Sequence, residues 1–200
     1  MKTLLAFTEM SFRFPELGNI WKPPLILHGP WGTGKTETIL QTIMYLIDKH
    51  AEVQRSSNPY SVQVNKFPLQ RILLATHTNS AADLCITKRL DKYITEKGFK
   101  MLRIVAPSRS VNAVPEEVLK YCKLGAKRDS FLFPTPEEIL SAQVVVITTS
   151  CAVSLLRPAE LYGQFTHIFL DEAAQCCEAE AIIPLVLAKP QTVIFLAGCA

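Results

Sequence analysis

A run of eight residues has the types and spacing of a loop that binds phosphate. It matches the pattern G-x-x-x-x-G-K-T/S and consists of Gly29, Pro30, Trp31, Gly32, Thr33, Gly34, Lys35 and Thr36. Glycines let backbone N–H groups approach phosphate oxygens without Cβ clashes, and a helix that begins at the loop directs its positive end at them. In this pattern Lys35 reaches the β- and γ-phosphates and the Thr36 hydroxyl binds Mg²⁺. The loop therefore predicts a nucleotide site.

Two acidic residues, Asp171 and Glu172, directly follow the apolar run that begins at His167. In a Walker B segment the first acid holds Mg²⁺ and the second orients and activates the attacking water. The pair alone is a weak signal, because acids often follow strands. Its position downstream of a phosphate loop, with one more strand after it, favours the nucleotide role for both carboxylates.

Six near-continuous apolar runs predict the strands that must position these residues. Runs of this kind are typical of parallel strands covered on both faces. The predicted strands are Pro24–His28, Arg71–Thr76, Leu102–Ala106, Val144–Thr149, His167–Asp171 and Thr192–Ala197.

Apolar residues at helical spacing predict helices between the strands, at Thr36–Lys49, Ser80–Lys97 and Ala174–Ala188. Asn79 or Ser80 is expected to cap the second helix, and Pro184 is expected to end or kink the third. Alternation of strands and helices at this spacing predicts an α/β fold, and the phosphate loop makes it one of the P-loop NTPase type. We expect a mostly parallel sheet with helices on both faces.

Two stretches fall outside this alternation. Ala51–Phe67 is polar and predicts an exposed loop. Pro107–Pro136 contains four prolines and predicts an inserted subdomain, with short helices at Glu116–Leu124 and Glu137–Leu140. The middle of the chain is basic, because residues 51–130 carry 14 Lys or Arg against 7 Asp or Glu, and the insertion holds much of that charge. Such a segment fits a nucleic-acid surface or a solvated face equally well.

Composition sets the broad class of the protein. With 48% apolar and 20% charged residues among 200, the chain can form a full core. No apolar stretch approaches the roughly 20 residues of a membrane span, and the apolar start is too short for a signal peptide. The six cysteines form no C-x-x-C pair and have no histidine at zinc-finger spacing, so they predict reduced thiols rather than a disulfide framework.

The run D-E-A-A-Q at Asp171–Gln175 is far more specific than an acid pair. Together with four further motifs, the chain resembles superfamily 1B RNA helicases of the nonsense-mediated-decay type, most of all the animal helicases with zinc finger. The resemblance extends from about Pro23 to Gly198. Its other motifs are G-P-W-G-T-G-K-T at Gly29–Thr36, T-H-T-N-S-A-A-D-L at Thr76–Leu84, V-V-V-I-T-T-S at Val144–Ser150 and E-A-E-A-I-I-P-L at Glu178–Leu185.

The resemblance implies an ATP-binding, RecA-like domain at residues 23–200, after a lead-in at 1–22 and with the insertion at about 107–136. Lys35, Asp171, Glu172 and Gln175 would act in catalysis, with Gln175 sensing the γ-phosphate, and ATP with Mg²⁺ would be bound. Single-stranded RNA, rather than DNA, would be held by its backbone. The residues implied in that contact are Thr76, Asn79, Ser80, Thr148 and Thr149. The resemblance also implies a cytoplasmic protein that does not bind membranes and whose partners are ribonucleoprotein or RNA-decay factors.

The sequence also departs from the family. The motif that reads Leu-x-Gly-Asp in relatives is Leu196-Ala197-Gly198-Cys199 here, and no glutamine precedes the phosphate loop. A second RecA-like domain, which supplies arginine fingers, is expected to be absent. An arginine finger contributes roughly 10³–10⁵ in rate, so we expect nucleotide binding with weak turnover and no unwinding.

Two other functions remain open. A truncated isoform could bind RNA or protein without catalysis, in which case salt-dependent RNA binding would survive Lys35→Ala. A small nucleotide kinase or switch GTPase would also carry the phosphate loop, although the D-E-A-A-Q run argues against it and no N-K-x-D motif is present.

Overall fold

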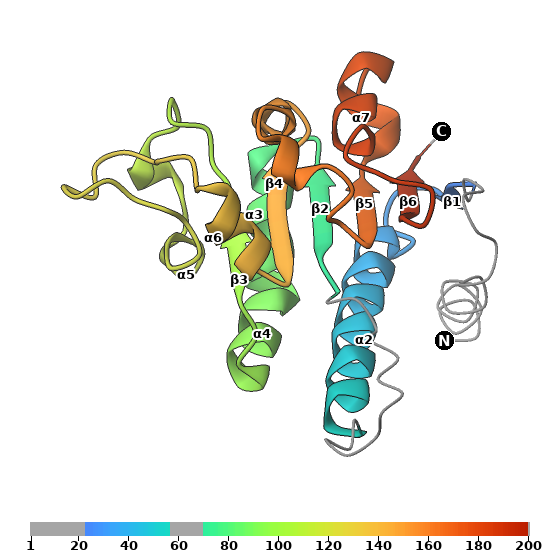
Figure 1. Ribbon diagram of the computed structural model, residues 1–200. Helices are drawn as coiled ribbons and strands as arrows, with labels where there is room; N and C mark the ends of the chain where they lie inside the picture. Colours follow the sequence, from blue (N-terminus) through green and yellow to red (C-terminus); the bar gives the residue numbers. More distant parts are fainter. Residues whose placement is uncertain (1–22, 57–69, 200) are drawn as a thin grey trace.

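The computed structural model describes residues 23–56 and 70–199. Within them, six strands form one sheet in the order β1-β6-β5-β2-β4-β3, and every pair of neighbours is parallel (Figure 1). The predicted parallel α/β fold is therefore confirmed. The strands are β1 (Leu25–His28), β2 (Ile72–Thr76), β3 (Met101–Arg103), β4 (Val144–Thr148), β5 (His167–Asp171) and β6 (Val193–Gly198).

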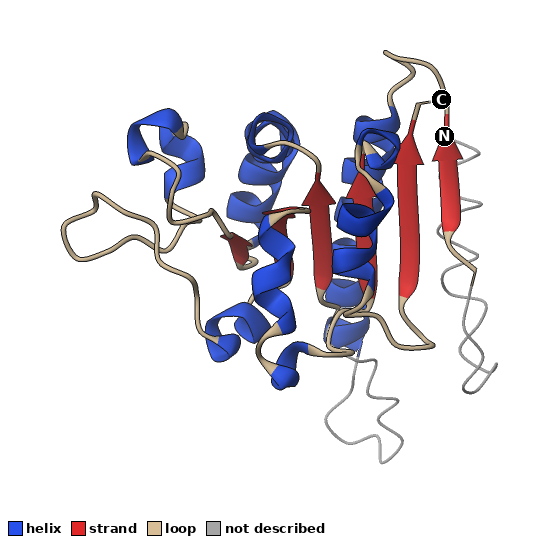
Figure 2. Cartoon of the chain, turned by 90° about the horizontal axis from the view of Figure 1, so that it is seen from above, coloured by secondary structure: helices blue, strands red, loops and turns tan. Residues whose placement is uncertain are grey.

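Helices cover both faces of the sheet, as the near-continuous apolar runs predict (Figure 2). On one face, Ile72 and Leu74 of β2 join a buried cluster with the apolar side of α2 and with α3 and α4. On the other face, Leu73 and Ala75 join Ile139 of α6 in a second cluster. The helices are α2 (Lys35–Ser56), α3 (Asn79–Cys85), α4 (Asp91–Lys97), α5 (Glu116–Leu119), α6 (Pro136–Ser141) and α7 (Glu178–Leu185).

The helix after the phosphate loop is longer than predicted. α2 continues to Ser56, so the first six residues of the loop expected at Ala51–Phe67 are helical. An ion pair between Lys49 and Glu52, 2.7 Å long, joins the expected helix to its extension. The remainder of the expected loop, residues 57–69, and the lead-in 1–22 lie outside the described residues.

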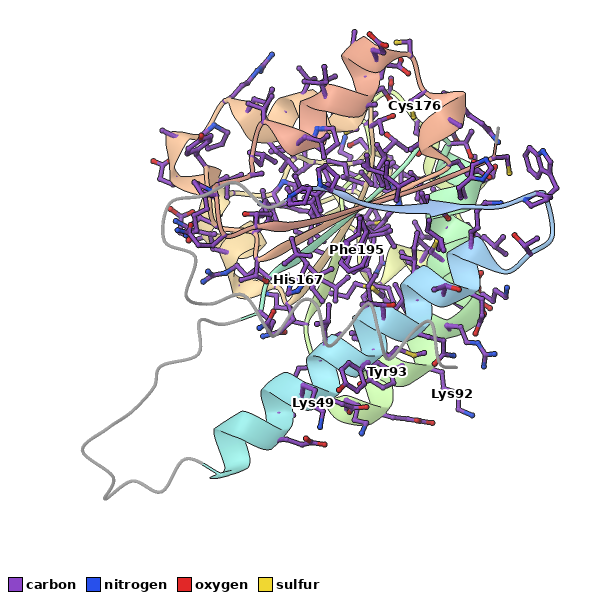
Figure 3. All side chains as sticks on the ribbon, turned by 90° about the vertical axis from the view of Figure 1, so that its right-hand side faces the viewer. Lys49, Lys92, Tyr93, His167, Cys176 and Phe195 are labelled. Atoms are coloured by element: carbon purple, nitrogen blue, oxygen red, sulfur yellow. The ribbon has the colours of Figure 1, made fainter. Side chains whose placement is uncertain are left out.

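The helix expected at Ser80–Lys97 is interrupted by a π-helical turn at Ile86–Leu90, between α3 and α4. Its cap is Thr78, whose side chain accepts a hydrogen bond from the Ala81 N–H, so the expectation of Asn79 or Ser80 as cap was wrong. The helix packs beside α2, because the Tyr93 hydroxyl donates to the carbonyl of Met44 over 2.8 Å (Figure 3).

The prediction of a single helix at Ala174–Ala188 was also wrong. A 3-10 turn at Ala173–Gln175 is followed by extended backbone at Cys176 and Cys177, and only then does α7 begin. The left-handed backbone of Glu172, with φ 58°, redirects the chain directly after β5 and prevents one continuous helix. Pro184 lies inside α7 as its next-to-last residue, and the helix ends at Leu185.

The inserted stretch lies beyond the β3 edge of the sheet (Figure 1). Val118 and Phe131 anchor it in the buried cluster that also contains residues of α3 and α4, and a bridge joins Leu124 to Phe131. The helix expected at Glu116–Leu124 is only the four residues of α5. The one expected at Glu137–Leu140 is α6, which begins with a capping box between Thr135 and Glu138.

A buried ion cluster ties this edge together. Asp83 of α3 accepts from Arg103 Nε of β3 over 3.2 Å and from Arg109 Nη2 of the insertion over 2.6 Å. Arg103 is fully buried, and it also donates to Asn79 Oδ1 over 2.8 Å. Three segments are therefore held by one carboxylate. Among the described helices, none has the length and apolar character that a membrane span requires.

Candidate functional site

The phosphate loop turns at the carboxyl end of β1 and runs directly into α2. Gly32 and Gly34 adopt left-handed backbone, with φ of 75° and 84°, which favours glycine at both positions. The Thr33 hydroxyl donates to the Pro30 carbonyl over 2.8 Å and stabilises the turn. An alanine Cβ at Gly29 would lie 2.9 Å from that hydroxyl oxygen. The glycines predicted from the motif are thus required by the conformation of the loop.

Lys35 folds back over the loop. Its Nζ donates to the carbonyl oxygens of Gly29 and Pro30, each over 2.7 Å, and lies 3.0 Å from Cys199 Sγ. The ammonium therefore lies where the first strand, the loop and the end of β6 meet. Cys199, the departure from the family pattern, is a direct neighbour of the loop lysine.

Thr36 and Asp171 meet although 135 residues separate them. The Thr36 hydroxyl donates to Asp171 Oδ2 over 2.7 Å, and the Glu172 N–H donates to Oδ1 over 3.0 Å. Asp171 is 2% exposed. Burial raises the pKa of its carboxyl, and the hydrogen bonds from Thr36 and Glu172 and the charge of Lys35 offset part of that rise. Two oxygen donors beside an open cleft suit a hard divalent cation such as Mg²⁺.

The turn that follows Asp171 carries Glu172 and Gln175 to the same edge. The Gln175 N–H donates to the Glu172 carbonyl over 2.9 Å and closes the turn. An alanine Cβ at Gly198 would come 2.9 Å from the backbone nitrogen of Ala174, so the end of β6 packs directly against this turn. Glu172 keeps this left-handed backbone, with φ 58°, although it is costly for a residue other than glycine.

These residues line a cleft of about 280 Å³ at the carboxyl edge of the sheet. It brings together most of the predicted nucleotide site and adds Glu37, Lys88, Gly198 and Cys199, which the sequence analysis did not assign to the site. Gly29, Pro30 and Thr33 support the loop rather than line the cleft. The complete lining is Trp31, Gly32, Gly34, Lys35, Thr36, Glu37, Lys88, Asp171, Glu172, Gln175, Gly198 and Cys199.

Lys88 reaches the cleft from the π-helical turn. Its Nζ lies 3.4 Å from Glu37 Oε2, while Arg89 Nε lies 3.0 Å from Glu37 Oε1. A hydrogen bond from Gln41, together with the two cations, lowers the pKa of Glu37. A helical pattern could not have placed Lys88, because its direction depends on the π-helical turn.

The residues expected to contact RNA lie along the same edge, beside the cleft. In the sheet register Thr76 pairs with Asp171 on one side and with Thr148 on the other. The Thr76, Thr148 and Thr149 side chains are buried, and the Thr76 hydroxyl donates to the Thr78 carbonyl over 2.9 Å. Asn79 accepts from Arg103, whereas Ser80 is exposed.

The basic side chains of the insertion are mostly engaged in ion pairs. Arg109 pairs with Asp83, Lys120 with Asp91, and Lys123 with Glu138 over 2.7 Å. These pairs favour the solvated-face interpretation of the insertion over a continuous cationic track.

Comparison with known proteins identifies the family. Residues 19–131 and 123–198 match the family described as AAA domain. The chain belongs to this family.

Three curated relatives show which members this AAA domain is similar to. It is 38% identical over 179 residues to the human "Probable helicase with zinc finger domain", covering 88% of this chain and 8% of the relative. It is 36% identical over 199 residues to the mouse "3'-5' exoribonuclease HELZ2", covering 98% and 6%. It is 32% identical over 167 residues to the mouse "RNA helicase Mov10l1", covering 82% and 12%. The expected resemblance to superfamily 1 RNA helicases is confirmed.

The AAA domain spans between 6% and 12% of the length of these three relatives. Among solved structures, the UvsW helicase from bacteriophage T4 aligns with a TM-score of 0.49 and 15% identity. That alignment covers 88% of this chain and 46% of the other.

Proposed function

We propose that this chain is the ATP-binding and ATP-hydrolysing first motor domain of an RNA helicase. The 2.7 Å contact between Thr36 and Asp171 carries the proposal. It joins the end of the phosphate loop to the end of the Walker B strand, at the wall of a cleft that also holds Lys35 and Glu172. These are the groups that phosphoryl transfer from a nucleoside triphosphate requires, at the edge of a parallel sheet where such ligands bind.

Binding would rest on the loop and on two oxygen ligands. The N–H groups of the loop and the positive end of α2 face the phosphates, and Lys35 exchanges the Gly29 and Pro30 carbonyls for β- and γ-phosphate oxygens. The Thr36 hydroxyl and the Asp171 carboxylate suit Mg²⁺, since both are oxygen donors and no other cation lies within ion-pair distance of Asp171 among the described residues. Mg²⁺ held there would supply positive charge that stabilises the phosphate oxygens.

Hydrolysis would depend on the turn after β5. Glu172 lies at the cleft and can accept a proton from the attacking water, while the neighbouring Asp171 remains with the cation. Gln175, held to Glu172 by the N–H bond that closes the turn, can hydrogen-bond to the γ-phosphate or the water. The resemblance supports Gln175 as the residue that links hydrolysis to movement.

RNA would bind along the adjoining strand ends. Exposed Ser80 and the backbone that follows β2 and β4 can contact phosphate and 2′-OH groups without reading bases. Thr76 lies in register between Asp171 and Thr148, so a shift of the Walker B strand would also move the strand ends that we propose contact RNA. The buried threonines Thr76, Thr148 and Thr149 would act mainly by positioning that backbone.

Turnover by this chain alone would be weak. Among the described residues that line the cleft, the cations are Lys35 and Lys88, and none is an arginine. An arginine finger contributes roughly 10³–10⁵ in rate, and the resemblance implies that a second RecA-like domain supplies it. We therefore propose nucleotide binding with slow hydrolysis and no strand displacement by the 200 residues alone.

The test is ATP hydrolysis by the purified chain with and without single-stranded RNA, beside Lys35→Ala. Slow turnover that RNA stimulates and Lys35→Ala abolishes supports the proposal. RNA binding that falls with salt, unchanged by Lys35→Ala and without nucleotide binding, supports instead a non-enzymatic binding domain. If GTP competes for the nucleotide site better than ATP does, the chain belongs to a different class of NTPase, such as a switch GTPase.

A further inference from the structure

Three side chains that can bind metal converge beside the cleft, from three separate segments. His77 follows β2, Cys176 lies in the extended link after β5, and Glu180 lies in the first turn of α7. Their ligand atoms all lie within 4.8 Å of one another. In Figure 3, Cys176 lies near the end of the sheet opposite His167, which begins β5. The cluster is thus at the carboxyl edge and adjoins the cleft, although none of its three residues lines it.

We propose that His77, Cys176 and Glu180 form a site for Zn²⁺. Zinc in proteins takes imidazole nitrogen, thiolate sulfur and carboxylate oxygen, usually in tetrahedral geometry. In such a site, the ligand atoms lie about 3.3–3.6 Å apart, given zinc bonds of about 2.0–2.3 Å. The distance from Cys176 Sγ to His77 Nδ1 is 3.5 Å, and that from His77 Nδ1 to Glu180 Oε2 is 3.9 Å.

The sulfur and the nitrogen already have the separation of two zinc ligands, and the carboxylate needs only a small movement. The Glu180 side chain is 38% exposed and the His77 side chain 32% exposed, so both can rotate and a metal ion can enter. The donor set selects the metal, because thiolate and imidazole favour zinc over Mg²⁺ or Ca²⁺. The site therefore differs in chemistry from the Thr36 and Asp171 pair.

The contacts of the thiol support this assignment. Besides His77, Cys176 Sγ has only long contacts, 3.9 Å to Thr149 Oγ1 and 3.9 Å to the Glu172 carbonyl oxygen. Its shortest polar contact is therefore the one with His77, the second proposed ligand. Three protein ligands leave a fourth position for water or for an oxygen of a bound molecule.

A metal here would join the segments that follow two neighbouring strands, β2 and β5. Cys176 directly follows Gln175, and His77 directly follows Thr76, so zinc would link the Walker B turn to the loop after β2. That link would restrict the turn that carries Gln175. The inference concerns metal binding and can be tested without any nucleotide or RNA.

The experiment uses the full chain, stripped with chelator and titrated with Co²⁺ and then Zn²⁺. Cobalt bound by a thiolate gives a charge-transfer absorption band, and zinc displaces it. We expect one ion per chain and displacement by a stoichiometric amount of zinc. Cys176→Ser should abolish the band, whereas the matched control Cys177→Ser, an exposed neighbour outside the cluster, should keep it.

A second pair of variants keeps both thiols. Glu180→Gln should weaken metal affinity about tenfold or more, since one of three ligands is lost. Glu178→Gln, in the same helical turn but outside the cluster, should not. The proposal is overturned if stripped chain binds no stoichiometric metal, if Cys177→Ser removes the band as fully as Cys176→Ser, or if Glu180→Gln and His77→Gln both keep full affinity. The last comparison decides the matter even if Cys176→Ser fails to fold.

Discussion

Two buried carboxylates in this domain have opposite surroundings. Asp83 is 5% exposed and is paired with two arginines, Arg103 and Arg109. Asp171 is 2% exposed, yet its hydrogen-bond donors are a hydroxyl and a backbone N–H, those of Thr36 and Glu172. One carboxylate has its counter-charges within the protein, and the other lies at a cleft with its charge uncompensated by a direct ion pair.

The difference in partners distinguishes a carboxylate that holds the fold together, Asp83, from one that is free to bind a cation, Asp171. A buried ion cluster such as that of Asp83 holds segments together, and removing one partner leaves the others without compensation. A buried carboxylate without a cation is unfavourable in the folded state, and burial accordingly raises the pKa of Asp171. Such a group is suited to bind a cation from solution. The first two predictions below contrast these roles directly, and the last two refine them.

The largest expected effect is on stability, from Asp83→Ala. It leaves fully buried Arg103 without its carboxylate and should lower the free energy of unfolding by about 3–5 kcal/mol. Denaturant unfolding measures it. The control is Glu96→Ala, which breaks the exposed pair with Lys92 and should cost less than about 1 kcal/mol. Equal losses in the two variants would contradict the structural role given to Asp83.

Lys35→Ala should affect ligand binding instead. Loss of a hydrogen bond from a charged donor costs about 1.5–3 kcal/mol, which corresponds to roughly 10–100-fold weaker nucleotide binding. Calorimetric titration with ATP and Mg²⁺ measures it, with unfolding recorded in parallel. Nucleotide affinity that survives intact in Lys35→Ala would show that the loop is not the phosphate site.

Asp171→Asn should change how stability depends on pH. Because the folded-state pKa is raised above the ordinary value of 3.8, the folded chain holds this proton more tightly than the unfolded chain. Stability of the ligand-free protein should therefore fall as pH rises from about 3.8 through the raised pKa. The asparagine variant should lack that decline and should also lose the Mg²⁺ dependence of nucleotide binding. Unfolding by urea across this range, for both proteins, tests it; parallel curves would contradict it.

Lys88→Ala should have the smallest effect. Its side chain is 47% exposed, so its loss should weaken nucleotide binding by less than about fivefold. Arg89→Ala is the matched control, because Arg89 contacts the same Glu37 but does not line the cleft. If both substitutions weaken binding equally, the effect passes through Glu37 rather than through contact with the nucleotide.

The sequence predicted what depends on neighbouring residues. The phosphate loop and the Asp171–Glu172 pair are local patterns, and the apolar runs indicated all six described strands, with β3 shorter than expected. Features that depend on packing were missed. The left-handed backbone at Glu172 divided a helix that the pattern of apolar residues made continuous. Lys88 and the cluster of His77, Cys176 and Glu180 come together only in three dimensions, and no spacing in the sequence marks them.

The π-helical turn at Ile86–Leu90 has a consequence for insertions and deletions. A π-turn contains one residue more than an α-turn would, so deleting one residue there should leave an unbroken α-helix. Because the wide turn already accommodates that extra residue, such a deletion should leave the side chains of α3 and α4 in about their present directions and change mainly those within the turn. Lys88 lies within the turn and Tyr93 packs on Met44 just beyond it. In this segment the number of residues in the turn, as much as their types, sets whether a side chain such as Lys88 reaches the cleft.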